Sequence, residues 1–192
     1  ELTDIKLPET AVLANDCFAA CYKIKNLVIP RGNITLNGVN VGRTANVVLP
    51  DDVLEVNGPI SNGGNSWDNI NSGNSTLKSI DLKNVRILTN GALADCIVLD
   101  KVTLPDSLIT LGMNAFRNCR KLRSIEGGGN VRQIGSCCFA DCSELDDFGD
   151  LEKSVRNVGA LAFLDTDWFH DQPNGVVYFG KAAYAYKGTM AK

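Results

Sequence analysis

Cysteine and histidine are the residue types in this sequence with the widest chemical range. The chain contains seven cysteines and a single histidine, His170. A thiolate can act as a nucleophile, bind a metal ion or form a disulfide, and histidine can serve as a base or a metal ligand. The cysteine number is odd and no C-x-x-C pair occurs, so the usual zinc and thioredoxin patterns are absent.

The spacing of the cysteines indicates packing more than chemistry. Four of them lie three residues after a recurring Phe or Leu, and Ala and Phe are their periodic neighbours. A metal ladder would need His or acidic partners in the same layers, whereas free Cys packs well as a small hydrophobic residue. We therefore predict buried free thiols, with a disulfide framework or a metal ladder as the alternative. These four are Cys21, Cys96, Cys119 and Cys142.

The remaining cysteines differ in their setting. Cys17 and Cys138 occupy a position that is Ala in related segments, so they read as conservative replacements. Cys137 falls outside the pattern, and neighbouring cysteines such as Cys137 and Cys138 rarely form a disulfide with each other because the backbone must distort. Cys137 is therefore the candidate to test for a reactive or pairing thiol.

A catalytic triad would have to use His170, which has Asp167 and Asp171 close in sequence. Residues that are close in sequence need not have the geometry of a catalytic triad. The sequence also contains no G-x-S-x-G, H-E-x-x-H or phosphate-loop pattern. We predict instead that Trp168 and Phe169 cover the end of a core and that His170 is their solvated neighbour. No enzymatic activity, metal or cofactor is predicted.

Composition excludes several other classes. Hydrophobic residues make up 44% and charged residues 21% of the 192 residues, which is typical of a folded domain. The net charge is −3 with both signs scattered, so a nucleic-acid partner is not expected. No apolar run reaches the roughly 18 residues that a membrane span needs. The chain begins at Glu1 inside a repeat and has no secretory signal, so we expect a mature or trimmed segment.

An internal repeat dominates the sequence. Segments 2–23, 77–98, 99–121, 122–144 and 145–163 share the pattern L-x-x-I-x-L-P, a polar turn, a second apolar pair and then A-F-x-x-C. The aromatic position is held by Phe18, Leu93, Phe116, Phe139 and Phe163. From Leu93 onward the spacing between these positions is almost constant, which chance would not maintain.

Each copy has a readable physical design. Alternation in a strand points Ile5 and Leu7 inward and Asp4 and Lys6 outward. Proline ends the strand because it has no N–H to donate, and A-F-x-x-C suits one helical turn on the opposite wall. A single copy cannot bury its apolar side, whereas stacked copies share one core. We predict a right-handed α/β solenoid with one long parallel sheet and short helical turns.

Residues 24–76 follow the pattern loosely. Ile29-Pro30 and Leu49-Pro50 continue the strand positions, but the step from Leu49 to Leu82 is much longer than the other steps. The Gly-, Asn- and Ser-rich stretch 57–76 holds the excess. We therefore predict one solenoid domain over 1–192, with regular turns 2–23 and 77–166, irregular turns with an insertion over 24–76, and a cap over 167–192.

This pattern resembles the BspA-type leucine-rich repeat of large surface proteins from gut and oral bacteria and some protists. The resemblance covers 2–23 and 77–163, and the tail 168–189 resembles a segment that recurs in that family. It implies an extracellular or cell-surface location and a role in adhesion or protein recognition. The motif is specific to the repeat type, not to a ligand.

The ends of the stack differ. VVYF (176–179) and AAYAY (182–186) flank Gly180-Lys181, which suits a type II′ hairpin turn and predicts a C-terminal β-hairpin cap. Its aromatic residues, Tyr178, Phe179, Tyr184 and Tyr186, could cover the last layer. The N-terminal end has no comparable element, which favours a piece of a longer array or an edge that meets a partner.

The outward positions of the strands form the first candidate binding surface, since solenoids offer extended faces. This face is polar and mixed in sign. Trp67 in the insertion is a second candidate, as a packed anchor or an exposed contact. The strand positions are Asp4, Lys6, Asn26, Asn46, Ser79, Asp81, Lys101, Thr103, Ser124 and Glu126, with Val28 and Val48 between them.

Taken together, the residues and the resemblance predict a non-enzymatic bacterial module that recognises a host or microbial protein. A structural spacer that displays other domains is the alternative. A third possibility is carbohydrate binding through Trp67 and the tail aromatics.

Overall fold

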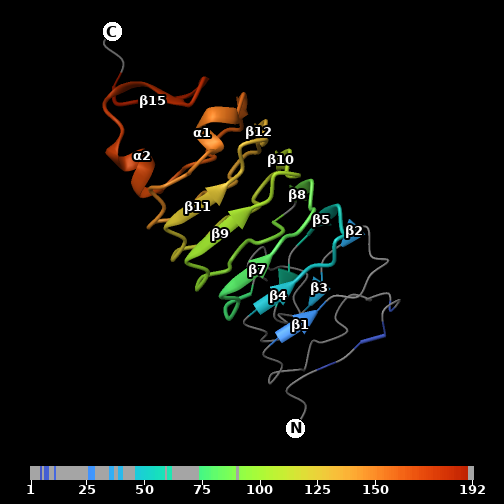
Figure 1. Cartoon of the computed structure of the whole chain (residues 1–192). Helices are drawn as coiled ribbons and strands as arrows, with labels where there is room; N and C mark the ends of the chain where they lie inside the picture. The colour runs from blue at the N-terminus through green and yellow to red at the C-terminus, as the bar shows by residue number, and fades with distance from the viewer. Residues whose placement is uncertain are drawn as a thin grey trace.

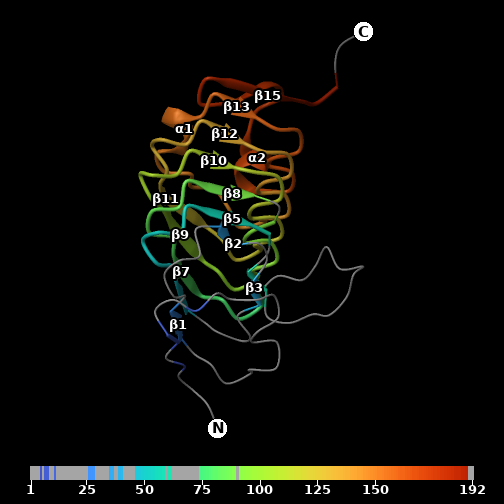
Figure 2. The same ribbon diagram turned by 90° about the vertical axis from the view of Figure 1, so that its right-hand side faces the viewer.

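The computed structural model describes residues 5, 7, 8, 11, 26–28, 35–36, 39–40, 46–58, 60–61, 74–89 and 91–189, with the backbone alone at 26–28, 35–36, 39–40 and 61. Within these residues the chain winds as a solenoid whose turns are stacked side by side (Figures 1 and 2). Each turn carries two short strands, which pair in parallel with the equivalent strands of the neighbouring turns. The predicted leucine-rich-repeat solenoid is confirmed.

The L-x-x-I-x-L segments form the first wall. β1 (Asn26–Val28), β4 (Asn46–Val48) and β7 (Ser79–Asp81) make a three-stranded parallel sheet. β9 (Lys101–Leu104) lies beside β7 and pairs with β11 (Ser124–Gly127), so the wall continues along the stack (Figure 1). Inward positions alternate with outward ones, and Val47, Ile80, Val102 and Ile125 are buried.

The second apolar pair of each repeat forms another wall, where the sequence analysis expected no sheet. The prediction of a single long sheet was therefore wrong. The residues of the second apolar pair are also extended, and they pair with the equivalent residues of neighbouring turns to form a second parallel sheet. The wall is a six-stranded parallel sheet. In spatial order it contains β13 (Asn157–Val158), β12 (Gln133–Ile134), β10 (Thr110–Leu111), β8 (Ile87–Thr89), β5 (Glu55–Asn57) and β2 (Thr35–Leu36). A separate parallel pair joins β3 (Val39–Asn40) and β6 (Ile60–Ser61).

The A-F-x-x-C segments form the third wall as tight turns, so the predicted helical turns are wrong for the described repeats. Turns cover 91–95, 113–118, 136–141 and 160–165. Asp95, Asn118 and Asp141 have positive φ angles of 58°, 60° and 64°, which no helix accommodates and which Asp and Asn tolerate better than most residues. In the described part of the chain, the helices are α1 (Leu151–Ser154) and α2 (Asp167–Asp171).

The core runs through the interior of the stack and ends in aromatic rings. Phe116, Phe139 and Phe163 are fully buried and stacked, with centroids 5.4 Å and 5.8 Å apart and nearly parallel planes. Phe148 meets Phe139 and Phe163 edge-on at 5.3 Å and 5.1 Å. Offset stacks and edge contacts are the favoured arrangements of aromatic rings. Ile5 and Leu7 are half-buried and pack against this core, as predicted.

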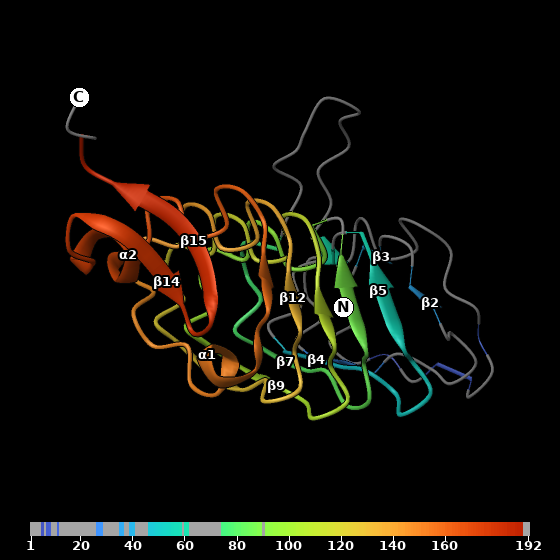
Figure 3. The same cartoon turned by 90° about the horizontal axis from the view of Figure 1, so that it is seen from above.

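The C-terminal segment closes the stack as a hairpin (Figure 3). β14 (Gly175–Phe179) pairs antiparallel with β15 (Ala182–Lys187) across a two-residue turn in which Gly180 has φ 57°. Phe179 stacks on Phe163 at 4.5 Å, and Trp168 is 9% exposed against the same ring. The predicted cap is therefore seen, although Tyr178 and Tyr186 are 58% and 48% exposed and do not cover the last layer.

Candidate functional site

The outward side of the first wall presents a row of polar side chains. Parallel register places Asn46 beside Ser79, Lys101 beside Ser124 and Thr103 beside Glu126. All but Ser124 are exposed, and Ser124 is half-buried. We call this surface the strand face. Its described members are Asn46, Ser79, Asp81, Lys101, Thr103, Ser124 and Glu126.

Cross-strand contacts hold these side chains in place. The Ser79 hydroxyl donates to Asn46 Oδ1 at 2.6 Å, and Thr103 Oγ1 donates to Glu126 Oε2 at 3.0 Å. Lys101 Nζ lies 3.8 Å from Glu126 Oε1. Exposed ion pairs of this kind contribute little to stability. Their consequence is a pre-ordered surface that carries both charges, and a pre-ordered surface loses less entropy when a partner binds.

The strand face also has a charged border. Asp81 accepts the Lys83 backbone N–H at 3.1 Å, and its other oxygen lies 2.7 Å from Lys83 Nζ. Glu144 bridges Lys121 at 2.5 Å and Arg123 at 2.8 Å. The hydrogen bond from Lys121, and next to it the one from Arg123, hold the pKa of the Glu144 carboxyl below its usual value. Glu144 therefore stays charged at neutral pH.

Some of the predicted site residues lie outside the part of the chain that the structure describes. Asp4, Lys6 and Trp67 lie outside the described residues, and so do Cys17 and Cys21. Asn26 is described by its backbone, which pairs β1 with β4 opposite Asn46. The strand face is therefore seen from Asn46 onward.

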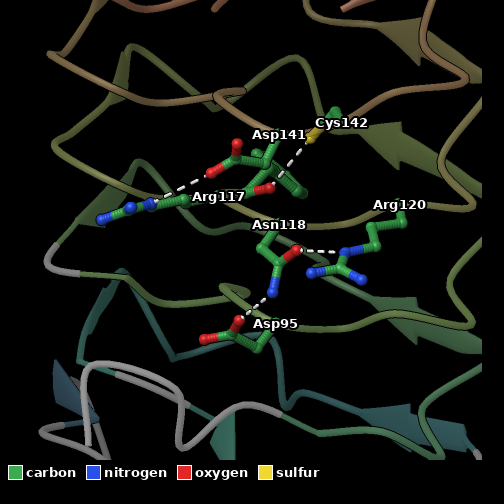
Figure 4. A network of polar contacts seen from close by, with 7 residues as sticks. Asp95, Arg117, Asn118, Arg120, Asp141 and Cys142 are labelled. Atoms are coloured by element: carbon green, nitrogen blue, oxygen red, sulfur yellow. Dashed lines mark hydrogen bonds and ion pairs between the residues drawn. The ribbon is translucent and has the colours of Figure 1, made fainter. Parts of the chain in front are cut away.

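A second polar row runs along the turn wall, and the sequence analysis missed it (Figure 4). Asn118 Nδ2 donates to Asp95 Oδ1 at 2.5 Å, and Arg120 Nε donates to Asn118 Oδ1 at 2.6 Å. One turn further on, Arg117 Nε lies 3.5 Å from Asp141 Oδ2. The available signal was the recurrence of Asp or Asn directly before Cys96, Cys119 and Cys142.

The cysteine ladder lies behind this row and is buried. Cys96, Cys119 and Cys142 are 0% exposed, and Cys119 and Cys142 donate their thiol hydrogens to the carbonyls of Leu93 and Phe116, both at 3.0 Å. The adjoining Cys119 thiol and burial raise the pKa of Cys96, and burial raises the pKa of Cys119. The prediction of buried free thiols is confirmed for these three.

Cys137 has a different environment from the ladder. It is half-buried and has φ 54°, at the place that Gly91 and Asn114 occupy in the two preceding turns, also with positive φ. Cys137 is therefore less buried than the ladder cysteines. Cys138 beside it is fully buried, and burial raises its pKa.

Alkylation should separate these cysteines. Under native conditions at about pH 8 we expect iodoacetamide to modify Cys137 before the other described cysteines, because Cys137 is partly exposed and the reagent cannot reach the buried sulfur atoms. Cys96, Cys119, Cys138 and Cys142 should react only after denaturation. Peptide mass spectrometry with and without urea measures this directly. Equal labelling of all five under native conditions would contradict the buried ladder.

His170 lies in α2 with an exposed side chain, and its Nε2 is 3.9 Å from Asp165 Oδ1. The sequence analysis had considered Asp167 and Asp171 as its neighbours instead. Among the described residues, no group of three or more His, Cys, Asp and Glu side chains is arranged to hold a metal ion. Within the same residues no helix has the length and apolar character needed to cross a membrane.

A family model described as a BspA type leucine rich repeat region matches residues 1–41 and 69–189 with six copies. The chain belongs to the BspA-type leucine-rich-repeat family. Among curated proteins, no sequence matches this BspA-type chain significantly.

Two solved structures are similar to this BspA-type chain. One is a leucine-rich cell surface protein from Faecalibacterium prausnitzii A2-165, with 20% identity and a TM-score of 0.50 over 65% of this chain and 31% of that one. The other is the leucine-rich-repeat protein TpLRR of T. pallidum, with 22% identity and a TM-score of 0.44 over 74% and 76%. The chain thus spans about a third of the F. prausnitzii protein, and the first likeness supports the fold alone.

Proposed function

We propose that this BspA-type chain is a single solenoid domain that recognises a protein partner at the bacterial cell surface without catalysis. The observation that supports it most is the strand face, where cross-strand contacts order polar side chains of both charges on a rigid sheet. Family membership and the printed description of the F. prausnitzii protein as a cell surface protein support the location.

The strand face suits a polar partner with complementary charges. It lacks large aromatic anchors among its described members, so affinity would come from matched hydrogen bonds and ion pairs. The alternation of Lys101 with Asp81 and Glu126 along the stack gives such a partner a definite register. A partner bound in this way should dissociate more readily as salt is added.

Charge removal on the strand face tests the proposal. Lys101→Ala combined with Glu126→Ala should weaken binding to any protein ligand found on an array of extracellular host and microbial proteins by about tenfold or more, because several charge-assisted contacts are lost. Glu55→Ala with Arg86→Ala removes one acid and one base near the second sheet and is the matched control. Surface plasmon resonance with both variants measures the difference.

Equal binding by the strand-face variant and the control would contradict the assignment of the face. The spacer alternative would be supported if this chain bound no protein and another domain of the full-length protein carried the binding. The two outcomes are therefore distinguishable.

Carbohydrate binding is a second candidate function, and one observation favours it. Val176, Tyr178 and Tyr186 project from the outer side of the β14–β15 hairpin and are 55%, 58% and 48% exposed. Exposed aromatic rings can stack on sugar faces, and Tyr also offers a hydroxyl for hydrogen bonding. A glycan array probed with Tyr178→Ala and the parent chain separates this candidate from protein recognition at the strand face.

A further inference from the structure

A hollow of about 460 Å³ lies where three parts of the chain meet. Arg132 comes just before β12, Lys153 and Ser154 end α1, and Lys181 is in the hairpin turn of the cap. Figure 3 shows the tip of this hairpin next to α1. The remaining lining residues are Gly129, Val155 and Arg156. We call this hollow the basic pocket, and none of its residues belongs to the strand face.

The fold holds the walls of the basic pocket in position. A Cβ atom on Gly180 would lie 1.9 Å from the Glu152 carbonyl oxygen, so the hairpin tip packs directly on the backbone of α1. This contact keeps Lys181 at the pocket. On the other side, Arg132 Nη1 donates to the carbonyls of Gly129 and Ser154 at 3.4 Å and 3.3 Å. The Arg132 guanidinium is therefore anchored by the backbone.

The stacking of turns aligns the two arginines. The Arg156 N–H donates to the Arg132 carbonyl at 3.0 Å, so these residues occupy equivalent places in adjacent turns. Both side chains are exposed. Neighbouring parallel strands lie about 4.8 Å apart, which brings two guanidinium groups to the same opening.

The charge of the basic pocket is largely uncompensated. Lys153 pairs with Asp150 at 2.5 Å, and this contact raises the pKa of Lys153. Among the described residues, no carboxylate lies within 4.0 Å of Arg132, Arg156 or Lys181. Three free positive charges thus gather in a chain whose net charge is −3. Such a concentration of one sign in a concave place attracts anions.

We propose that the basic pocket binds a phosphate or sulfate ester carried on a group of about the size of one sugar. Guanidinium groups recognise oxyanions through paired N–H donors, and lysine adds a mobile point charge. A hollow of about 460 Å³ exceeds a bare phosphate ion. It falls in the range of roughly 300–1,000 Å³ that is typical of small-molecule sites. Val155 and Ser154, which are both buried, also line the pocket.

Titration with defined probes tests this pocket. Glucose 6-phosphate, glucosamine 6-sulfate, inorganic phosphate and glucose are each added to the chain, and binding is measured by calorimetry and by the Nε–H resonances of Arg132 and Arg156. The pocket variant is Arg156→Gln with Lys181→Gln. The control is Arg86→Gln with Lys78→Gln, which removes the same charge at exposed residues outside both the basic pocket and the strand face. If the double variant fails to fold, Lys181→Gln alone is measured instead, because Lys181 is exposed in a turn and its replacement should leave the fold intact.

We expect one or both esters to bind the parent chain, with the arginine resonances shifting and glucose causing no change. The pocket variant should bind the ester about tenfold more weakly or worse, and the control should stay within about twofold. Binding should also weaken as salt is raised. The relative affinities of the phosphate and sulfate probes then identify the ester, and tighter binding of an ester than of inorganic phosphate supports a role for the sugar-sized part.

Three results would overturn the proposal. They are an equal loss of binding in the pocket variant and the control, unchanged binding in the pocket variant, and no binding of either ester at millimolar concentration. Inorganic phosphate that binds as tightly as both esters would reject the sugar-sized part.

Discussion

Replacement of Phe139 by alanine is expected to lower the free energy of unfolding by about 3–5 kcal/mol. Phe139 is 0% exposed and touches rings on both sides, with centroids 5.4 Å from Phe116 and 5.8 Å from Phe163. Phe148 meets it edge-on at 5.3 Å. Alanine would leave a cavity between two turns, and the neighbouring rings are held by their own turns and cannot collapse into it. Denaturation by urea, followed by circular dichroism, measures the loss.

Two further variants make the Phe139 result specific. Tyr178→Ala removes an aromatic ring that is 58% exposed on the cap hairpin and should change stability by less than about 0.5 kcal/mol. Phe139→Leu should cost less than Phe139→Ala, since Leu93 fills the equivalent place two turns earlier and is also fully buried. A Phe139→Ala protein as stable as the Tyr178→Ala protein would show that the aromatic position does not build the core.

The repeat pattern was sufficient to predict the stacking of turns because equivalent side chains complete each other's core. Leu104, Phe116 and Cys119 are all buried, at places that recur with the period of the repeat. The same pattern could not reveal the second sheet. A short apolar pair such as Val131 and Ile134 is compatible with a strand or with a turn of helix. The backbone partners in the next turn decide between the two.

The turn wall shows the same limit for local signals. Helix-forming residues in A-F-x-x-C favoured a helical turn, but a single turn of helix has no stability of its own. Hydrogen bonds between neighbouring turns replace helical ones, as from the Phe116 N–H to Cys138 O at 2.8 Å and from Asn118 N–H to Ala140 O at 2.8 Å. Asn118 itself has a positive φ of 60°, which a right-handed helix does not allow.

The candidate sites differ in how far the sequence predicts them. Strand alternation is enough to place Ser79, Lys101 and Glu126 on one surface, because the period of a strand is two residues. The basic pocket, in contrast, could not be predicted without the three-dimensional fold. Arg132 and Arg156 occupy equivalent places in adjacent repeats, but no spacing rule brings Lys181 and its hairpin turn onto α1. The close packing at Gly180 does so, and it is visible only in three dimensions.

A row of glycines on the second wall was also missed, although Gly112, Gly135 and Gly159 recur with the period of the repeat. Each directly follows the second wall's strand in its turn, and its N–H donates to the preceding turn. The bonds are short, 2.6 Å from Gly112 to Leu88 O and 2.7 Å from Gly135 to Leu111 O. A Cβ atom on Gly135 would lie 2.5 Å from the Gly112 carbonyl carbon and 2.6 Å from the Met113 nitrogen. Both obstructing atoms are backbone, so no side-chain rotation relieves the clash.

Gly135→Ala is therefore expected to destabilise the chain by about 3 kcal/mol, the upper part of the usual range for overpacking. The added methyl must push two turns apart, which weakens the hydrogen bonds and the shared core between them. Gly129→Ala is the matched control. Its Cβ would lie 3.7 Å from the nearest atom, Asp150 Cβ, which is ordinary contact.

Urea unfolding of both glycine variants, together with hydrogen exchange of the Gly135 and Gly159 amides, measures the effect. The Gly129→Ala protein should unfold within about 1 kcal/mol of the parent chain. In the Gly135→Ala protein the Gly135 amide should exchange faster, because its bond to Leu111 O joins the two turns that the methyl group separates. The Gly159 amide bonds to Ile134 O, between the next two turns, and should change less. Unchanged stability and exchange in Gly135→Ala would mean that neighbouring turns do not approach as closely on this wall as the structure shows.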